Sequence, residues 1–253
     1  MPMSDISLLS KRKFIVTNDI TVHIPTLREI RGNDDEMSRQ ADYWSIVNMF
    51  AATACDIMIE LDEQGIDFTK WSDFNTFLMM FNGIDKKLLH DMSPLMFDDI
   101  DLSNFVIKEN SNKSALLLVD EQKNVVIDEL VYMRLSTIFC TINNMKKNHR
   151  KMGNEVMRKY AIERAKAHRQ NAKRVKQEAE SYFDKQIIAM VNNRDFKYNF
   201  ETVNNLTIYD FNVSLKQLTK NRAVDNLYRG IYAGTIKYTA EYNNKLNWLD
   251  YES

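Results

Sequence analysis

The sequence predicts a predominantly α-helical α+β fold that contains a small antiparallel sheet and hairpin. Apolar residues recur at helical spacing over several long stretches. Glycine and proline number only six and three in 253 residues, whereas a fold dominated by sheets consumes glycine in its many tight turns. Three short β-rich runs lie close together between turn-forming residues. Because 44% of the residues are hydrophobic and 11% aromatic, the composition excludes a disordered chain.

The N-terminal region predicts a β-hairpin followed by one short helical turn. Residues 14–16 and 20–24 are rich in Ile, Val and Phe, and residues 17–19 (Thr-Asn-Asp) form the expected turn between them. Pro25 ends the second strand because it cannot donate a hydrogen bond to a neighbouring strand. Residues 25–30 are the expected helical turn.

Two helices form the best candidate for the core. Apolar residues recur at helical spacing from residue 37 to residue 64, and Gly65 is well placed just beyond the C-terminus of that helix. A second helix is predicted over residues 70–81, with four phenylalanine and leucine side chains on one face and Gly83 at its end. In the region that follows, Pro94 is expected to interrupt any helix.

A β-meander and a capped helix complete the first half of the chain. Residues 105–107, 115–119 and 125–127 are β-rich, and turn-prone residues separate them. Asp128 is a plausible N-cap because its carboxylate can accept a hydrogen bond from the first turn of a helix. That helix is expected to reach Met145.

The net charge of −1 conceals a strong segregation along the chain. Residues 1–144 carry 13 basic and 23 acidic side chains, and residues 145–176 carry 12 basic and two acidic ones. Residues 177–253 are nearly balanced, with nine and ten. We therefore divide the chain into an acidic mixed α/β body, residues 1–144, and a second part, residues 145–253, that contains a long basic helix and a C-terminal helical region.

The basic segment is predicted to continue as a helix, with a soft boundary at Gly153 and Asn154. It has an apolar seam of heptad period that consists mostly of alanine and therefore buries little area. We name this the predicted seam, and its residues are Met157, Ala161, Ala165, His168, Ala172, Val175, Ala179 and Tyr182. We expect the part from Met157 to Val175 to bind a helical protein partner, flanked by Arg158, Arg164 and Arg169. The alternative is packing against the chain's own core.

The remaining C-terminal region predicts further helical structure. Residues 187–191 are apolar and precede a loop that extends to Asn199. A helix is expected from about residue 208 to residue 232, and Gly234 follows it. The chain then carries Trp248 between two leucines near its end.

Motifs of known catalytic chemistry are missing from the sequence. There is no Gly-rich phosphate loop, no H-E-x-x-H, no C-x-x-C and no G-x-S-x-G, and the four histidines are dispersed. We therefore expect no enzymatic activity, no cofactor and no metal site. One enzymatic alternative is a Mg²⁺-dependent nuclease, because Asp98, Asp99 and Asp101 are clustered carboxylates and Lys123 follows a nearby strand. The competing interpretation of residues 121–124 is a solvated turn.

A second alternative is nucleic-acid binding by the basic helix of residues 145–176. Its twelve Lys and Arg residues could neutralise phosphates without reading base sequence. Only Tyr160 lies among them to stack on a base. A solvated helix face, or a helix laid against the acidic body, would explain the same residues.

The location of the protein is expected to be the cytoplasm. Residues 1–10 lack a positively charged region followed by an apolar one, so no secretory signal is apparent. The longest aliphatic run, residues 115–119, is far shorter than the roughly 20 residues that span a bilayer. Cys55 and Cys140 each lie alone in apolar surroundings, which favours buried free thiols.

Three groups of aromatic and apolar landmarks together resemble a family of proteins from tailed phages and prophages of Gram-positive bacteria. The landmarks are residues 25–30, 43–47 and 65–68 before Trp71; then residues 151–155; and finally residues 206–211, 214–218, 228–234 and 246–249. Members of this family are similar to tail assembly chaperones, or at least to virion-morphogenesis proteins. The landmarks cover most of the chain and include no catalytic residue.

The resemblance implies a function in protein–protein contact. A tail assembly chaperone is expected to hold the long, helical, aggregation-prone tape measure protein while the phage tail is built. The implied partner is therefore a tape measure-like structural protein, or a second copy of the chain, and the implied location is the cytoplasm of the infected bacterial host. Nucleic acid is a less favoured partner, and a membrane is not expected.

Overall fold

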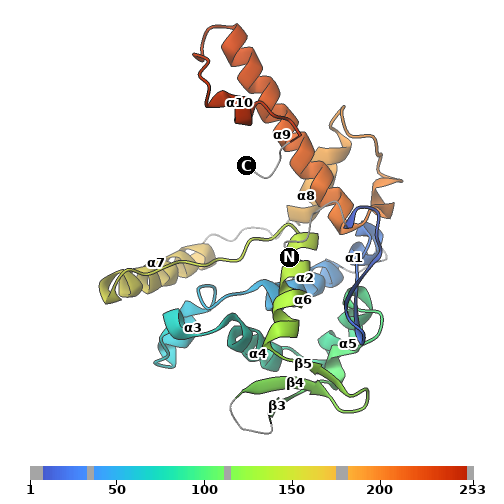
Figure 1. Ribbon diagram of the computed structural model, residues 1–253, viewed down its shortest axis with the longest axis vertical. Helices are drawn as coiled ribbons and strands as arrows, with labels where there is room; N and C mark the ends of the chain where they lie inside the picture. Colours follow the sequence, from blue (N-terminus) through green and yellow to red (C-terminus); the bar gives the residue numbers. More distant parts are fainter. Residues whose placement is uncertain (1–7, 33–36, 111–114, 175–181, 250–253) are drawn as a thin grey trace.

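The computed structural model describes residues 8–32, 37–110, 115–174 and 182–249. Within them the protein is predominantly helical with two small antiparallel sheets, which confirms the predicted fold class (Figure 1). None of the helices in these ranges is both long and apolar enough to cross a membrane.

The N-terminal hairpin and helical turn form as predicted. Strands β1 (Lys13–Thr17) and β2 (Ile20–His23) pair antiparallel. Helix α1 (Leu27–Arg31) begins with a capping box, in which Thr26 and Glu29 each bond the other's backbone N–H. Arg12 also donates to both carboxylate oxygens of Glu29, at 2.6 and 2.7 Å. These contacts fix the direction in which the chain leaves the hairpin.

The expected single helix over residues 37–64 is wrong, because the chain forms two helices there. Helix α2 (Met37–Ala51) ends before Thr53, and α3 (Met58–Glu63) follows a short irregular segment. Within that segment the Thr53 N–H donates to the Asp56 carboxylate at 2.8 Å, and the Thr53 hydroxyl lies 2.9 Å from the Asn148 carbonyl. Such side-chain bonds compete with the helix. Gly65 follows α3 with φ +72°, in the role expected of it.

The next two helices differ in detail from the prediction. After a 3₁₀ turn, η2 (Phe68–Lys70), helix α4 (Asp73–Gly83) follows its N-cap Ser72 and begins three residues later than expected. Helix α5 (Lys86–Met96) contains Pro94, so the expectation that this proline interrupts any helix is wrong. Pro94 lies in the last turn, where its missing N–H removes a single helical hydrogen bond.

The β-meander is confirmed, and the helix that follows it forms but ends at Ile142, three residues before the expected Met145. After η3 (Leu102–Asn104), strands β3 (Val106–Glu109), β4 (Leu116–Asp120) and β5 (Val125–Ile127) form one antiparallel sheet in the order β3-β4-β5. Helix α6 (Glu129–Ile142) begins at Asp128, whose carboxylate accepts from the Val131 N–H at 2.8 Å.

The basic segment is not one continuous helix. Helix α6 ends at Ile142, residues 145–152 have no regular structure, and α7 (Glu155–Arg174) begins only after Gly153 and Asn154. The end of α6 has the geometry of a Schellman motif. Asn144 adopts φ +53°, and the Met145 N–H donates to the Cys140 carbonyl at 2.8 Å. Asparagine tolerates this left-handed conformation, so the Asn143-Asn144 pair ends the helix.

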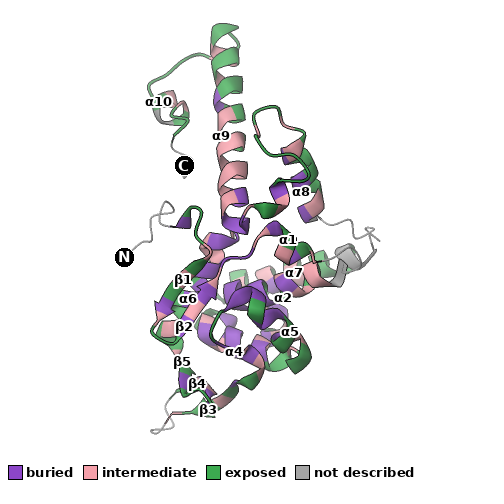
Figure 2. Cartoon of the chain, turned by 90° about the vertical axis from the view of Figure 1, so that its right-hand side faces the viewer, coloured by how far each residue is buried: buried purple, intermediate pink, exposed green. Residues whose placement is uncertain are grey.

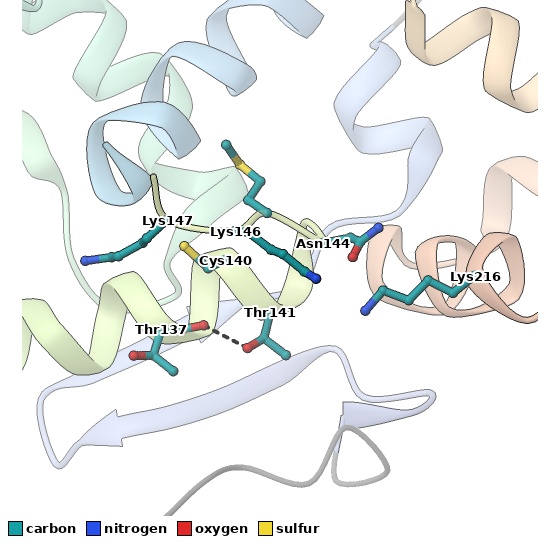
Figure 3. Close-up of a pocket in the computed structure, with 8 residues that line it drawn as sticks. Thr137, Cys140, Thr141, Asn144, Lys146, Lys147 and Lys216 are labelled. Carbon is teal, nitrogen blue, oxygen red and sulfur yellow. Dashed lines mark hydrogen bonds between the residues drawn. The ribbon is translucent and has the colours of Figure 1, made fainter. Parts of the chain in front are cut away.

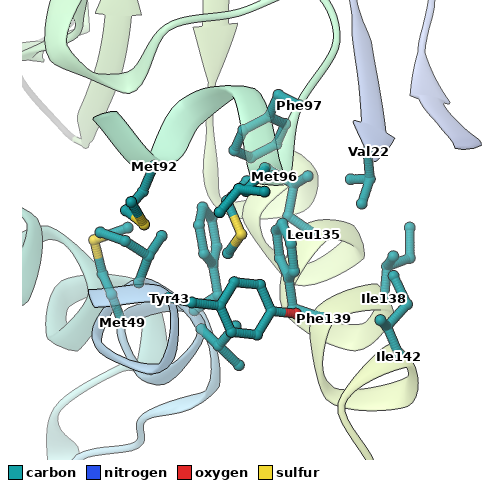
Figure 4. Close-up of a cluster of buried hydrophobic side chains, with 14 of the residues drawn as sticks. Val22, Tyr43, Met49, Met92, Met96, Phe97, Leu135, Ile138, Phe139 and Ile142 are labelled. Atoms are coloured by element: carbon teal, nitrogen blue, oxygen red, sulfur yellow. The ribbon is translucent and has the colours of Figure 1, made fainter. Parts of the chain in front are cut away.

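One large core cluster holds most of these elements together. Phe50 of α2 lies at its centre, with ring centroids 4.6 Å from Phe139 and 5.0 Å from Phe77. Figure 4 shows Tyr43, Phe97 and Phe139 converging in this core. Helices α2 and α4, from the two segments expected to form the core, therefore do so together with α5 and α6, whereas α3 does not join this cluster.

The C-terminal region joins the same cluster. Helix α8 (Tyr182–Val191) and the base of α9 (Ile208–Tyr232) contribute Phe183, Ile187 and Phe211 to it. Two backbone hydrogen bonds just after the 3₁₀ turn η4 (Val203–Asn205) add to this attachment. The Leu27 N–H donates to the Leu206 carbonyl, and the Ile208 N–H donates to the Pro25 carbonyl. Residues on both sides of 144 thus share a core, and the division into two parts at that residue stays a prediction.

Helix α9 matches its predicted bounds and extends beyond the body. Burial falls along it from base to tip (Figure 2). After Gly234, the chain turns back and forms the short helix α10 (Tyr242–Lys245) beside α9. The Gln217 side chain, on α9, donates to the Trp248 carbonyl at 2.7 Å. We call residues 219–249 the distal arm.

Candidate partner-binding surfaces

Helix α7 lies against the protein's own body. Its Ile162 is only 6% exposed and joins a second, smaller apolar cluster with Met58, Leu61 and Phe68. Helix α3 is the element on which α7 packs. Because this cluster is separate from the large core, α7 is attached to the molecule at one localised contact.

The predicted seam is divided between that contact and solvent. Ala161 and Ala165 are half-buried and pack against the small cluster. Met157 and His168 are exposed. Ala172 lies within α7, but its side chain is outside the described part of the structure, as are Val175 and the rest of the predicted seam. The structure therefore brings only part of the seam together as one surface.

Ion pairs align α7 with acidic side chains of the body. The Arg158 guanidinium lies 2.5 Å from Asp67, the Lys166 ammonium lies 2.8 Å from Asp62, and Arg169 pairs with Glu60. Arg164 is exposed. A hydrogen bond from Thr69 and the contact with Arg158 lower the pKa of the Asp67 carboxyl to about 2. The structure thus shows α7 laid against the acidic body, which was one of the alternatives for this segment.

These contacts reduce the basic surface that a nucleic acid would need. Besides the three cations above, Lys147 pairs with Asp73 at 2.8 Å and Lys159 with Glu155 at 3.0 Å. A phosphate backbone would have to compete with these carboxylates. Tyr160, which could stack on a base, is exposed on the outer side of α7.

Two of the three carboxylates considered for a nuclease take part in other interactions. Asp98 pairs with Lys13 at 2.9 Å. Asp101 caps η3 and lies 2.5 Å from the His90 ring nitrogen. Lys123 bonds the backbone carbonyl of Asp99. Over the described ranges, no three His, Cys, Asp or Glu side chains are grouped so that they could hold a metal ion. Residues 121–124 form the expected turn.

The distal arm presents an aromatic surface that was not among the binding residues predicted from the sequence. The rings of Tyr228 and Tyr232 stack with their centroids 6.2 Å apart, and Tyr232 is 85% exposed. Tyr238 and Trp248 are also exposed. The i, i+4 spacing of Tyr228 and Tyr232 in a polar helix was a usable signal. Residues 219–249 carry five basic and two acidic side chains, so the surface is also basic.

A small pocket lies where α6 ends and α9 begins its outward course. Its volume is about 300 Å³, and it is lined by Thr137, Cys140 and Thr141 of α6, residues 144–147 and Lys216. Figure 3 shows Lys146 and Lys216 approaching it from opposite sides. Burial raises the pKa of the Cys140 thiol, which the nearby Lys147 charge only partly offsets. This pocket was not predictable from the sequence, because Lys146 and Lys216 are 70 residues apart along the chain.

The described residues form a predominantly helical fold with exposed aromatic and basic surfaces. Residues 175–251 match the family described as the YomV second domain. This match indicates a phage- or prophage-type protein family and covers α8, α9 and the distal arm. No curated protein and no solved structure matches the chain.

Proposed function

We propose that this phage-associated protein acts by protein–protein contact and holds a helical structural protein, similar to a tape measure protein, during virion assembly. The observation that carries the proposal is the exposed aromatic surface of the distal arm, which lies within the region matching the YomV second domain. Such a protein would act in the cytoplasm of the infected bacterial host and would need no catalytic residue or cofactor.

The chemistry of the arm is typical of a protein-binding surface. Tyr, Trp and Arg are the residues that most often dominate binding energy at protein interfaces. Tyr228, Arg229 and Tyr232 are neighbours on one stretch of α9, and Trp248 lies on the chain that returns beside it. Exposed aromatic side chains are well suited to the apolar stripe of an amphipathic helix.

The outer edge of α7 offers a weaker surface for the same partner. Val156, Met157 and Tyr160 are all exposed there. Ala161 and Ala165 of the predicted seam, by contrast, are half-buried against the body. A partner could therefore use the seam fully only if α7 were released from α3. We therefore place the first contact on the arm.

Co-expression with the tape measure protein of the source phage tests this function. We expect a complex on size-exclusion chromatography and a larger soluble fraction of the partner. The double substitution Tyr228→Ser and Tyr232→Ser should remove both effects, while Phe200→Ser, at a similarly exposed site outside the arm, should leave them unchanged. Loss of the complex with Tyr160→Ser alone would instead place the contact on α7.

A gel shift at low salt examines the nucleic-acid alternative. Binding through phosphate contacts weakens with salt, with a slope of about −0.9 per phosphate contacted on duplex DNA. We expect no shift of DNA or RNA. A salt-sensitive shift, combined with failure to bind the structural protein, would overturn the proposed function.

A further inference from the structure

Helix α6 has one face that the body does not cover. Leu130 is 70% exposed and Met133 is 55% exposed. Thr137, which is exposed, and Thr141, which is half-buried, continue the same face at spacings of four residues. We call these four residues the open α6 face. At 1.5 Å per residue the helix is about 21 Å long, which is enough to support a partner helix of similar length.

The pocket described above lies at the C-terminal end of this face, and its lysines are not all neutralised. Lys147 is paired with Asp73 at 2.8 Å. Lys146 and Lys216 line the pocket, and within the described ranges neither has a carboxylate at ion-pair distance. Lys216 is half-buried and Lys146 is exposed, and two ammonium groups that line one pocket repel each other. An anionic group between them would relieve that repulsion.

The charges at the two ends of α6 define a direction for a bound helix. Its N-terminal end carries Asp128 and Glu129, whereas Lys146 and Lys216 lie at its C-terminal end. Helices commonly carry acidic residues in the first turn and basic residues in the last, because these charges complement the helix dipole. A helix that runs antiparallel to α6 would therefore place its acidic first turn at the lysine pocket.

We propose that the open α6 face binds an amphipathic helix that runs antiparallel to α6 and inserts an acidic side chain of its first turn between Lys146 and Lys216. Its apolar stripe packs on Leu130 and Met133. This inference rests on the proposed function in one respect: the helix is a segment of the structural protein that the distal arm contacts.

A designed peptide tests the site directly. The probe is a fluorescent amphipathic peptide of about 18 residues, with Leu at helical spacing, Glu in the first turn and Lys in the last. A second peptide has the two charged turns exchanged. By fluorescence anisotropy we expect the wild-type protein to bind the Glu-first peptide about tenfold more tightly than the Lys-first peptide.

Charge reversal provides the decisive comparison. The double variant Lys146→Glu and Lys216→Glu should reverse the preference between the two peptides, whereas Arg150→Glu with Arg222→Glu, two exposed sites, should retain it. Leu130→Ser with Met133→Ser should weaken both peptides together by about tenfold. A preference that is absent, or that charge reversal leaves unchanged in a folded variant, would refute the proposed site.

The arm variant separates this inference from the proposed function. Tyr228→Ser with Tyr232→Ser should bind the peptides as the wild-type protein does, because the arm is not part of the α6 face. If peptide binding behaves as expected but the structural protein forms no complex, the proposed function fails and the site stands. If the complex forms and the peptide preference is absent, the proposed function stands and the α6 site fails.

Discussion

Replacing Ile162 by alanine should release α7 from the body without unfolding the protein. Ile162 is the most deeply buried described side chain of α7, and it packs in the small cluster rather than in the large core. The change removes three carbon atoms, worth about 0.8 kcal/mol each. Alanine has a higher helix propensity than isoleucine, which offsets about 0.4 kcal/mol of this loss. The expected loss of docking free energy is therefore about 2 kcal/mol.

The ion pairs cannot compensate for this loss. Arg158, Lys166 and Arg169 all make their contacts near the surface, and pairs of this kind contribute about 0.2–1 kcal/mol each. Together they are of the same size as the single apolar contact, but they depend on the docked geometry that Ile162 maintains. An undocked helix of this length is only marginally stable in water, so release of α7 should also loosen its backbone hydrogen bonds.

Hydrogen exchange measured by mass spectrometry detects this release. Peptides that cover residues 155–171 should exchange about 30-fold faster in Ile162→Ala than in the wild-type protein, because 1.4 kcal/mol corresponds to a factor of ten. Peptides from α2 and α6 should not change. Val156→Ala is the matched control, since Val156 is 75% exposed on the same helix. Unchanged exchange over α7, with a lowered melting temperature of the large core, would refute the reasoning.

Two further predictions concern the stability of the body. Partial burial raises the pKa of Glu29, but hydrogen bonds from Arg12 and Thr26 outweigh it and hold the pKa at about 2, against an ordinary value of 4.5. Glu29→Gln should therefore lower the free energy of unfolding, measured in urea at pH 7, by about 1 kcal/mol. The difference in unfolding free energy from the wild-type protein should shrink as the pH falls from 4.5 toward 2. A difference that stays constant over this range would contradict the prediction. Gly65→Ala should destabilise the protein by about 1 kcal/mol because Gly65 has φ +72°. Gly83→Ala is the control, because Gly83 lies at the end of α4 and no atom is near the added Cβ. This change should be neutral or stabilise the protein by up to about 1 kcal/mol. Equal urea midpoints for the two variants would show that the backbone at Gly65 is not strained by alanine.

Features that depend on neighbouring residues were predictable from the sequence. The hairpin turn, the N-cap Asp128 and the bounds of α9 are confirmed, because a cap or turn needs only a side chain and a backbone group a few residues apart. The break between α2 and α3 is different. It is stabilised in part by the carbonyl of Asn148, 95 residues further along the chain, and no local pattern contains that information.

The candidate binding residues were also only partly predictable, because their exposure depends on contacts that are distant in the sequence. A regular apolar period in the sequence predicted a seam through Ala161 and Ala165, but the most deeply buried described side chain of α7 is Ile162, one position away. The facing direction of a helix depends on what it packs against, and that was unknown. The Asn143-Asn144 pair was a usable signal for the end of α6, because asparagine readily adopts the left-handed conformation.

The charge segregation along the chain now has a structural explanation. The most basic segment does not present all of its charge to a partner, because α7 lies beside the acidic stretch from Glu60 to Asp67 and several of its cations are paired there. Charge that is neutralised within the fold contributes little to long-range attraction of a ligand. Lys146, at the start of the basic segment, and Lys216, in the nearly balanced C-terminal region, are better placed for binding because within the described ranges no carboxylate of the fold pairs with them. In this protein, the charge that remains after folding is therefore a better guide to a binding surface than the charge density of the sequence.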